Sequence, residues 1–240
     1  MSENTGILLE TKDLSKYFTA KKGLLNRNPS VVKAVDHVSL SVRKGETLGL
    51  VGESGCGKST LLSVLEGINK PAEGEVLIDG EKVNGTGSNR SVVFQHYSLF
   101  PWMTTRKNVA FGIQQVRKEL SRTQRLQVAD EFLDKVGLSE FRNKYPSQLS
   151  GGMQQRAAIA RALAMDTEIL LMDEPFSALD PISRRQLQDL IKTLHHELGL
   201  TIVFVTHNME EAAYLGDRLC IMNHGETVSY THLRAHETLR

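Results

Sequence analysis

The segment TLGLVGESGCGKST, residues 47–60, joins an apolar run to a glycine-rich loop. Residues 47–52 predict a buried strand, and residues 52–60 fit the pattern G-x-x-x-x-G-K-[ST], which connects a strand to a helix. In this pattern the glycines let backbone N–H groups surround phosphate oxygens, Lys58 reaches the terminal phosphates, and the Ser59 hydroxyl ligates Mg²⁺. The alternative is a glycine-rich turn without a ligand. The predicted phosphate site consists of Gly52, Glu53, Ser54, Gly55, Cys56, Gly57, Lys58, Ser59 and Thr60.

Four further apolar runs predict strands, at residues 90–95, 168–174, 201–207 and 218–222. The middle runs are apolar on consecutive positions, which is typical of strands buried on both faces of a parallel sheet. Asp180 and Pro181 predict the start of a helix that ends at Gly199. This alternation of strands and helices indicates an α/β fold.

Two regions depart from a plain parallel sheet. Residues 7–42 and 74–83 alternate between apolar and polar side chains, which predicts an antiparallel β layer. Residues 96–165 hold several helical patterns and predict an inserted helical subdomain. We expect one domain over residues 1–228, a basic surface loop from residue 19 to residue 30, and a non-native tail at residues 229–240.

Composition narrows the class of protein. The 240 residues carry a formal net charge of +1, so no overall field points to a nucleic acid partner. Cys56 and Cys220 lie far apart in no paired motif, which argues against a disulfide framework or a zinc site. The N-terminus lacks the pattern of a signal peptide, and the apolar runs are shorter than the ~20 residues that cross a bilayer. If the protein works at a membrane, we expect another subunit to anchor it.

Polar residues follow three of the predicted strands. Asp173 ends a buried strand and is placed to hold Mg²⁺, while Glu174 suits a base that orients attacking water. Gln95 can contact both Mg²⁺ and that water, and His207 can reach a terminal phosphate. The alternative is that these residues end strands merely to reach solvent.

A second helix start that could bind an anion lies at LSGGMQQRAAIARAL, residues 149–163. The first N–H groups of a helix lack intrahelical partners, and this end carries roughly half a positive charge. The alternative is a simple N-cap followed by a helix of small residues that packs closely.

In their order and spacing, these motifs resemble the nucleotide-binding subunits of ATP-binding cassette (ABC) transporters. The resemblance covers about residues 7–228 and rests on the loop at 52–60, Gln95, LSGGMQQ, ILLMDE, SALD and His207. It implies an α/β fold, the P-loop NTPase ABC cassette, with a mainly parallel core sheet, an antiparallel β subdomain and an inserted helical subdomain. It also implies that ATP and Mg²⁺ bind, with Ser59, Gln95 and Asp173 around the metal and Glu174, His207 and Gln95 in catalysis.

The resemblance further implies that two cassettes pack head to tail around shared ATP. Ser150, Gly151, Gly152 and Gln154 would then contact the nucleotide of the partner, and Asp180 would lie at the dimer seam. The second cassette could be identical or different. Phe18 is the residue expected to stack on adenine, with Tyr17 as second choice, and the alternative for both is packing within the β layer.

The segment FPWMT followed by NV, within residues 100–109, is similar to the nitrate/sulfonate/taurine importer branch. The N-terminal part resembles the dipeptide/oligopeptide importer branch instead. An importer ATPase would receive a membrane permease through the helical subdomain, act indirectly with a solute-binding protein, and lie peripherally at the cytoplasmic face. Ordinary packing is the alternative for Trp102. An exporter or lipoprotein-release ATPase and a soluble non-transport ATPase remain the other functions, and the sequence names no solute.

Overall fold

The computed structural model describes residues 6–19 and 31–232. Most of the expected basic loop and the last eight residues of the expected tail lie outside the described residues. The chain divides into two compact units, residues 1–87 with 204–240, and residues 88–203.

The first unit contains the predicted antiparallel layer. Strands β1 (Ile7–Thr19), β2 (Val31–Arg43), β4 (Glu73–Ile78) and β5 (Glu81–Lys82) pair in the order β2-β1-β4-β5. Thr11 is opposite Leu40 on one side and Val76 on the other. Its buried hydroxyl accepts a hydrogen bond from the Leu40 N–H at 2.9 Å and donates to the Val38 carbonyl at 3.0 Å, which supports a register shift in β1.

The same unit holds the strand that leads into the glycine-rich loop. This strand, β3 (Thr47–Val51), is buried along its whole length and runs parallel to β9 (Arg218–Asn223). Helix α1 (Lys58–Glu66) packs beside β2, and α6 (Met209–Leu215) packs beside β3. Strand β10 (Glu226–His232) pairs with β9 and continues past residue 228, where the domain was expected to end.

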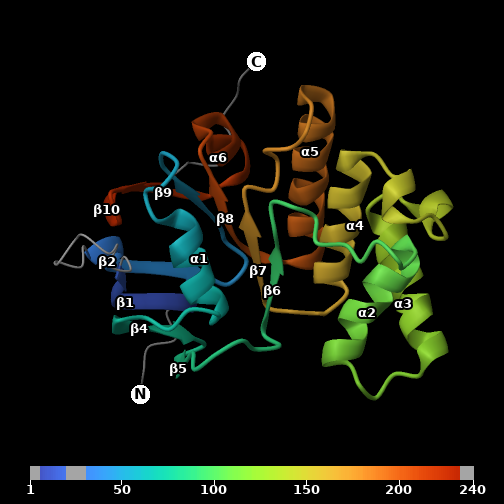
Figure 1. The fold of residues 1–240 in the computed structure, drawn as a ribbon, viewed down its shortest axis with the longest axis horizontal. Helices are drawn as coiled ribbons and strands as arrows, with labels where there is room; N and C mark the ends of the chain where they lie inside the picture. The colour runs from blue at the N-terminus through green and yellow to red at the C-terminus, as the bar shows by residue number, and fades with distance from the viewer. Residues whose placement is uncertain (1–5, 20–30, 233–240) are drawn as a thin grey trace, which may run out of the picture. The chain divides into compact units, whose positions relative to one another are not determined.

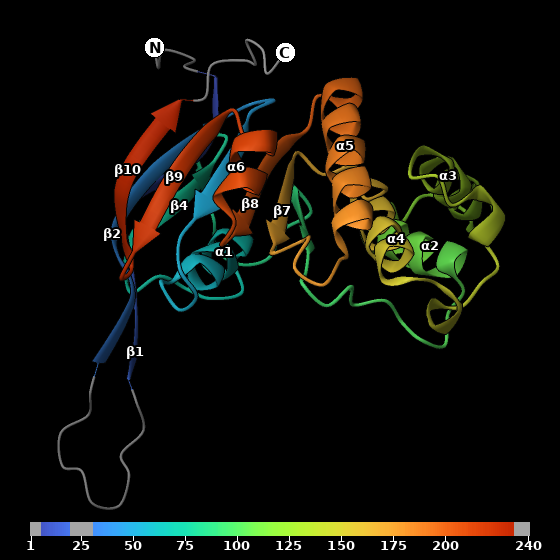
Figure 2. The same ribbon diagram turned by 90° about the horizontal axis from the view of Figure 1, so that it is seen from above.

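The second unit contains the predicted helical insertion. Strands β6 (Arg90–Val93) and β7 (Ile169–Asp173) are parallel, and the chain between them forms α2 (Thr105–Val116), α3 (Arg122–Lys135), the 3₁₀ turns Ser139–Phe141 and Pro146–Gln148, and α4 (Gly151–Leu163). Helix α5 (Pro181–Leu198) follows β7. Helix α4 lies between α5 and the α2–α3 pair (Figures 1 and 2). Strand β8 (Thr201–Thr206) begins in this unit, and its last three residues belong to the first unit.

Candidate nucleotide site

Helix α1 begins at the glycine-rich loop with no side-chain cap. Its N-cap, Gly57, is left-handed with φ 100° and makes no side-chain hydrogen bond. Each of the other described α-helices starts at a side chain that accepts a backbone hydrogen bond, and these caps are Thr104, Ser121, Ser150, Asp180 and Asn208. Because a helix start carries N–H donors and a positive dipole end, the α1 start is the most open anion site among these helices.

The glycines of this loop are needed for close backbone approach. A Cβ added to Gly57 would lie 1.8 Å from the Ala34 carbonyl oxygen, and one added to Gly52 would lie 2.3 Å from the Met222 carbonyl oxygen. The Lys58 side chain is buried and donates from Nζ to the carbonyl oxygens of Gly52 and Glu53, both at 2.7 Å. The loop thus curls around the lysine ammonium, and its residues fit the expected phosphate cradle.

His207 directly follows β8, and its side chain is exposed. The residues on either side of it, Thr206 and Asn208, are both held by hydrogen bonds. Before it, the buried Thr206 hydroxyl donates to a Glu211 carboxylate oxygen at 2.6 Å. After it, the Asn208 side chain caps α6 by accepting from the backbone N–H groups of Glu210 and Glu211. The backbone on both sides of the His207 ring is therefore anchored.

The two aromatic candidates in β1 have different surroundings. The Tyr17 hydroxyl donates to the Asp36 carboxylate at 2.7 Å, and the Lys33 ammonium binds the other oxygen of Asp36 at 2.7 Å. These two hydrogen bonds, with Lys33 the stronger, hold the pKa of Asp36 below its usual range. Phe18 is 43% exposed, with the Lys16 ammonium 5.4 Å from its ring centroid. Phe18 therefore exposes a large part of its side chain, whereas the Tyr17 hydroxyl is engaged with Asp36.

In the second unit, the parallel strands β6 and β7 bring three candidates to one sheet edge. Val93 pairs with Met172, so Gln95, Asp173 and Glu174 follow the carboxyl ends of adjacent strands. Glu174 is left-handed with φ 42°, a conformation that costs a non-glycine residue roughly 1–3 kcal/mol.

The turn after β7 holds Glu174 in this conformation. The Glu174 carbonyl accepts from the Ser177 backbone N–H at 3.2 Å and from the Ser177 hydroxyl at 3.0 Å. The first unit thus carries the glycine-rich loop, Phe18 and His207, and the second carries Gln95, Asp173 and Glu174.

The start of α4 differs from the open helix end that the sequence predicts. The Ser150 hydroxyl accepts from the Met153 backbone N–H at 3.3 Å, so one of the first donors has a partner. The Gln154 amide, expected to contact a partner's nucleotide, donates to the Leu149 carbonyl at 3.2 Å. An added Cβ at Gly151 would lie 2.8 Å from the Tyr97 hydroxyl, so a larger residue here would require the tyrosine side chain to shift. Gly152 likewise faces Ser183, whose Cβ would lie 3.3 Å from an added Cβ.

Asp180 has a structural role in addition to its expected place at a dimer seam. Its carboxylate caps α5 by accepting from the backbone N–H groups of Ile182 at 3.1 Å and Ser183 at 3.0 Å. Hydrogen bonds from the Ser183 side chain and backbone lower the pKa of Asp180.

The aromatic segment after Gln95 is held by Asn108, a residue that the sequence did not single out for this role. Its buried amide donates to the carbonyl oxygens of Phe100, Met103 and Thr104 at 3.1–3.2 Å. Trp102 is nevertheless 70% exposed, so ordinary packing does not account for it. Asn108 therefore fixes the backbone of this loop, while the Trp102 side chain is presented to solvent.

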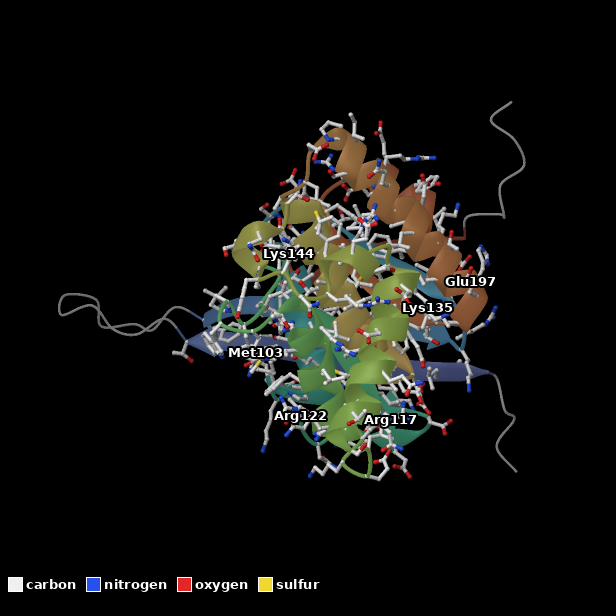
Figure 3. The ribbon with its side chains drawn as sticks, turned by 90° about the vertical axis from the view of Figure 1, so that its right-hand side faces the viewer. Met103, Arg117, Arg122, Lys135, Lys144 and Glu197 are labelled. Atoms are coloured by element: carbon white, nitrogen blue, oxygen red, sulfur yellow. The ribbon has the colours of Figure 1, made fainter. Side chains whose placement is uncertain are left out.

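A groove of about 350 Å³ lies next to this segment, and both apolar and basic side chains line it. Its lining consists of Met103, Lys107, Ala110, Phe111, Gln114, Arg122, Arg125 and Leu126. Figure 3 shows Met103 and Arg122 beside α2. Within the described part of the chain, none of the helices is both long and apolar enough to pass through a bilayer.

The strand–loop–helix unit of β3, the glycine-rich loop and α1, with acids after a parallel strand, has the architecture of a P-loop NTPase. The family described as "ABC transporter" matches residues 35–177. The nitrate import ATP-binding protein NrtD of Synechococcus elongatus is 45% identical over 83% of this chain and 72% of its own length. The bicarbonate transport ATP-binding protein CmpC of the same species is 43% identical over 80% of this chain, which spans 29% of CmpC.

Among solved structures, the ATP-binding cassette MJ0796, a dimer in a post-hydrolysis state bound to ADP and Pi, superposes with a TM-score of 0.82. It is 35% identical and covers 95% of this chain and 100% of its own. The chain belongs to the ABC transporter family and has the α/β fold of its cassettes, with an antiparallel β layer and a helical subdomain.

Proposed function

We propose that this chain is the ATP-hydrolysing subunit of an ABC importer. The main support is the start of α1, which lacks the side-chain cap found on the other described α-helices and follows a loop in which a Cβ at Gly52 or Gly57 would clash with backbone. A triphosphate supplies the negative charge that this helix start favours. NrtD and CmpC, the similar proteins above, are both named as ATP-binding proteins of import or transport systems.

Each candidate residue has a role in the proposed reaction. The loop at 52–60 and Lys58 bind the phosphates, and Ser59, Asp173 and Gln95 hold Mg²⁺, which neutralises phosphate charge when bound. Phe18 stacks on adenine. Glu174, directly after β7, orients water for in-line attack. His207 steadies the terminal phosphate.

A second cassette completes the site. Ser150, Gly151, Gly152 and Gln154 of one copy contact the nucleotide held by the other copy, and Asp180 lies at the seam between them. The dimeric state of the similar cassette MJ0796 supports this assembly. The long hydrogen bond at the Ser150 cap is consistent with a hydroxyl that can turn toward a phosphate.

The membrane permease docks on the second unit. Trp102 and the basic groove beside α2 form a fixed surface with apolar area, which suits a short helix from a membrane subunit. The ATPase then lies peripherally at the cytoplasmic face, and a solute-binding protein delivers the solute to the permease. Nitrate and bicarbonate are the first solutes to test, because NrtD and CmpC are named for them.

Complementation tests this proposal. The chain is expressed in cells that lack the ATPase of a nitrate importer, and uptake of nitrate and bicarbonate is measured, with Glu174→Gln as the matched control. We expect uptake with the parent chain and none with the control. ATP hydrolysis by the purified chain without uptake of any solute would instead favour an exporter or a non-transport ATPase.

A further inference from the structure

Arg161 ties the segment after Gln95 to helix α4. Its guanidinium donates from Nη1 to the Ser98 carbonyl at 2.7 Å and from Nη2 to the Tyr97 carbonyl at 3.4 Å. Ser98 is left-handed with φ 50°, and its hydroxyl donates to the His96 carbonyl at 2.8 Å. One side chain of α4 thus holds two successive peptide groups within three residues of Gln95.

The same segment also reaches the first turn of α4. The Tyr97 hydroxyl lies 2.8 Å from the position of a Cβ on Gly151. Arg161 is ten residues further along the helix, a rise of about 15 Å. Tyr97 therefore contacts α4 at two places, with its hydroxyl beside Gly151 in the first turn and its carbonyl on the Arg161 guanidinium.

The fold makes room for this contact at Gly112 of α2. A Cβ at Gly112 would lie 2.9 Å from Arg161 Cγ and 3.1 Å from the Arg161 carbonyl oxygen. Any larger residue would push α2 away from α4 or displace the arginine stem.

The guanidinium is held by geometry rather than by an opposite charge. Among the described residues, main-chain carbonyls and not a carboxylate accept its hydrogen bonds, and burial lowers the pKa of Arg161. The planar guanidinium of arginine can donate to two carbonyl oxygens at once from different nitrogens. A lysine ammonium is a compact charge on a single nitrogen and cannot reproduce this geometry.

We propose that Arg161 is a positioning residue that makes the Gln95–Ser98 segment and the Ser150 loop move as one body. The inference rests on the proposed function, because Gln95 and Ser150 are its two ends. We call the hydrogen bonds of Arg161 to Tyr97 and Ser98 the Arg161 clasp. The glycine-rich loop, Lys58 and Phe18 belong to the other unit, so most of the proposed nucleotide contacts lie outside this clasp.

Kinetics of the full chain test the proposal with matched variants. Arg161→Gln and Arg161→Lys remove the Arg161 clasp, and Arg156→Gln alters an arginine of the same helix that contacts Val136 and Gln186 instead. We expect kcat for ATP hydrolysis to fall roughly ten-fold in both Arg161 variants, the value of about one charge-assisted hydrogen bond, with KM for Mg·ATP changed less than about two-fold. Equal kcat losses in the Arg156 and Arg161 variants would overturn the proposal.

Hydrogen exchange separates this inference from the proposed function, because it needs no turnover. In Arg161→Gln, peptides covering residues 94–99 should exchange faster, and peptides covering α1 should not change. Unchanged exchange at 94–99 would refute the clasp even if hydrolysis slowed. Faster exchange at 94–99 together with full activity of a Gln95→Ala variant would keep the clasp and instead refute the role proposed for Gln95.

Discussion

Asn108 and Phe100 form a reciprocal pair of hydrogen bonds. The Phe100 backbone N–H donates to Asn108 Oδ1 at 2.7 Å, and Asn108 Nδ2 donates to the Phe100 carbonyl at 3.2 Å. The asparagine is fully buried and replaces, for the FPWMT loop, the backbone pairing that a strand would provide. This pairing fixes the backbone of the aromatic loop at Phe100.

Replacing Asn108 by alanine should therefore destabilise the chain. The variant leaves three carbonyl groups and one N–H without this partner, and we expect a loss of about 2–3 kcal/mol. Urea unfolding of Asn108→Ala, beside the exposed-site control Asn143→Ala, measures the effect. Equal stability of the two variants would contradict the structural role of this side chain.

Gly57→Ala and Gly55→Ala form a matched pair for the glycine-rich loop. Both glycines have positive φ, 100° and 84°, so each substitution carries roughly 1–2 kcal/mol of backbone strain. Only at Gly57 would the new Cβ also clash, 1.8 Å from the Ala34 carbonyl oxygen, while nothing lies within 4 Å at Gly55. Gly57→Ala should consequently lower the melting temperature much more than Gly55→Ala, and similar shifts would count against the close approach.

Glu174→Gln should slow ATP hydrolysis by ~10²–10⁴, the usual contribution of a positioned base. Nucleotide binding should be retained, because the substitution leaves unchanged the loop at 52–60, which we propose binds the phosphates. Steady-state turnover and ATP titration of the same preparation check both parts. A variant as active as the parent chain would remove Glu174 from the mechanism.

Lys58→Ala, unlike Glu174→Gln, should lose nucleotide binding. The ammonium that now binds the carbonyls of Gly52 and Glu53 is the group expected to reach the terminal phosphates, so ATP affinity should fall. Calorimetric titration with Mg·ATP is the measurement, and Lys70→Ala, outside the loop, is the control. An unaltered ATP affinity of Lys58→Ala would contradict the proposed role of Lys58 in phosphate binding.

The cap at Asp180 makes part of the stability pH-dependent. Its pKa is lower in the folded chain than in the unfolded chain, because Ser183 and the start of α5 hydrogen-bond the carboxylate. This contribution is fully present above the unfolded pKa, about 3.9, and is lost as the pH falls through the folded pKa. The stability difference between the parent chain and Asp180→Ala should therefore be constant near pH 7 and shrink in acid. A difference that grows in acid would have the wrong sign.

The sequence predicted most of the fold because its signals were local. Each of the five predicted apolar strands forms a strand, and Asp180 and Gly199 cap α5 as expected. β10 extends past residue 228 because its backbone pairs with β9, a contact that requires no apolar periodicity in the strand itself.

The site was predicted in type and only partly in detail. The candidates follow known strand ends and helix starts, so their residue numbers could be read from the motifs. The Asn108 pair, the Arg161 clasp and the Tyr17–Asp36 bond join residues 8 to 64 positions apart, and no local pattern encodes such contacts. Ser150 as a cap was the simpler alternative at this helix start, and the structure contains it.

We propose that the Ser150 loop of a partner completes each nucleotide site, and ATP turnover at decreasing chain concentration shows whether a second copy is required. Hydrolysis per chain is measured over a dilution series while light scattering reports the molecular mass. We expect turnover per chain to fall together with the dimer fraction and to vanish for the monomer. Full turnover by a chain that stays monomeric would contradict the shared site.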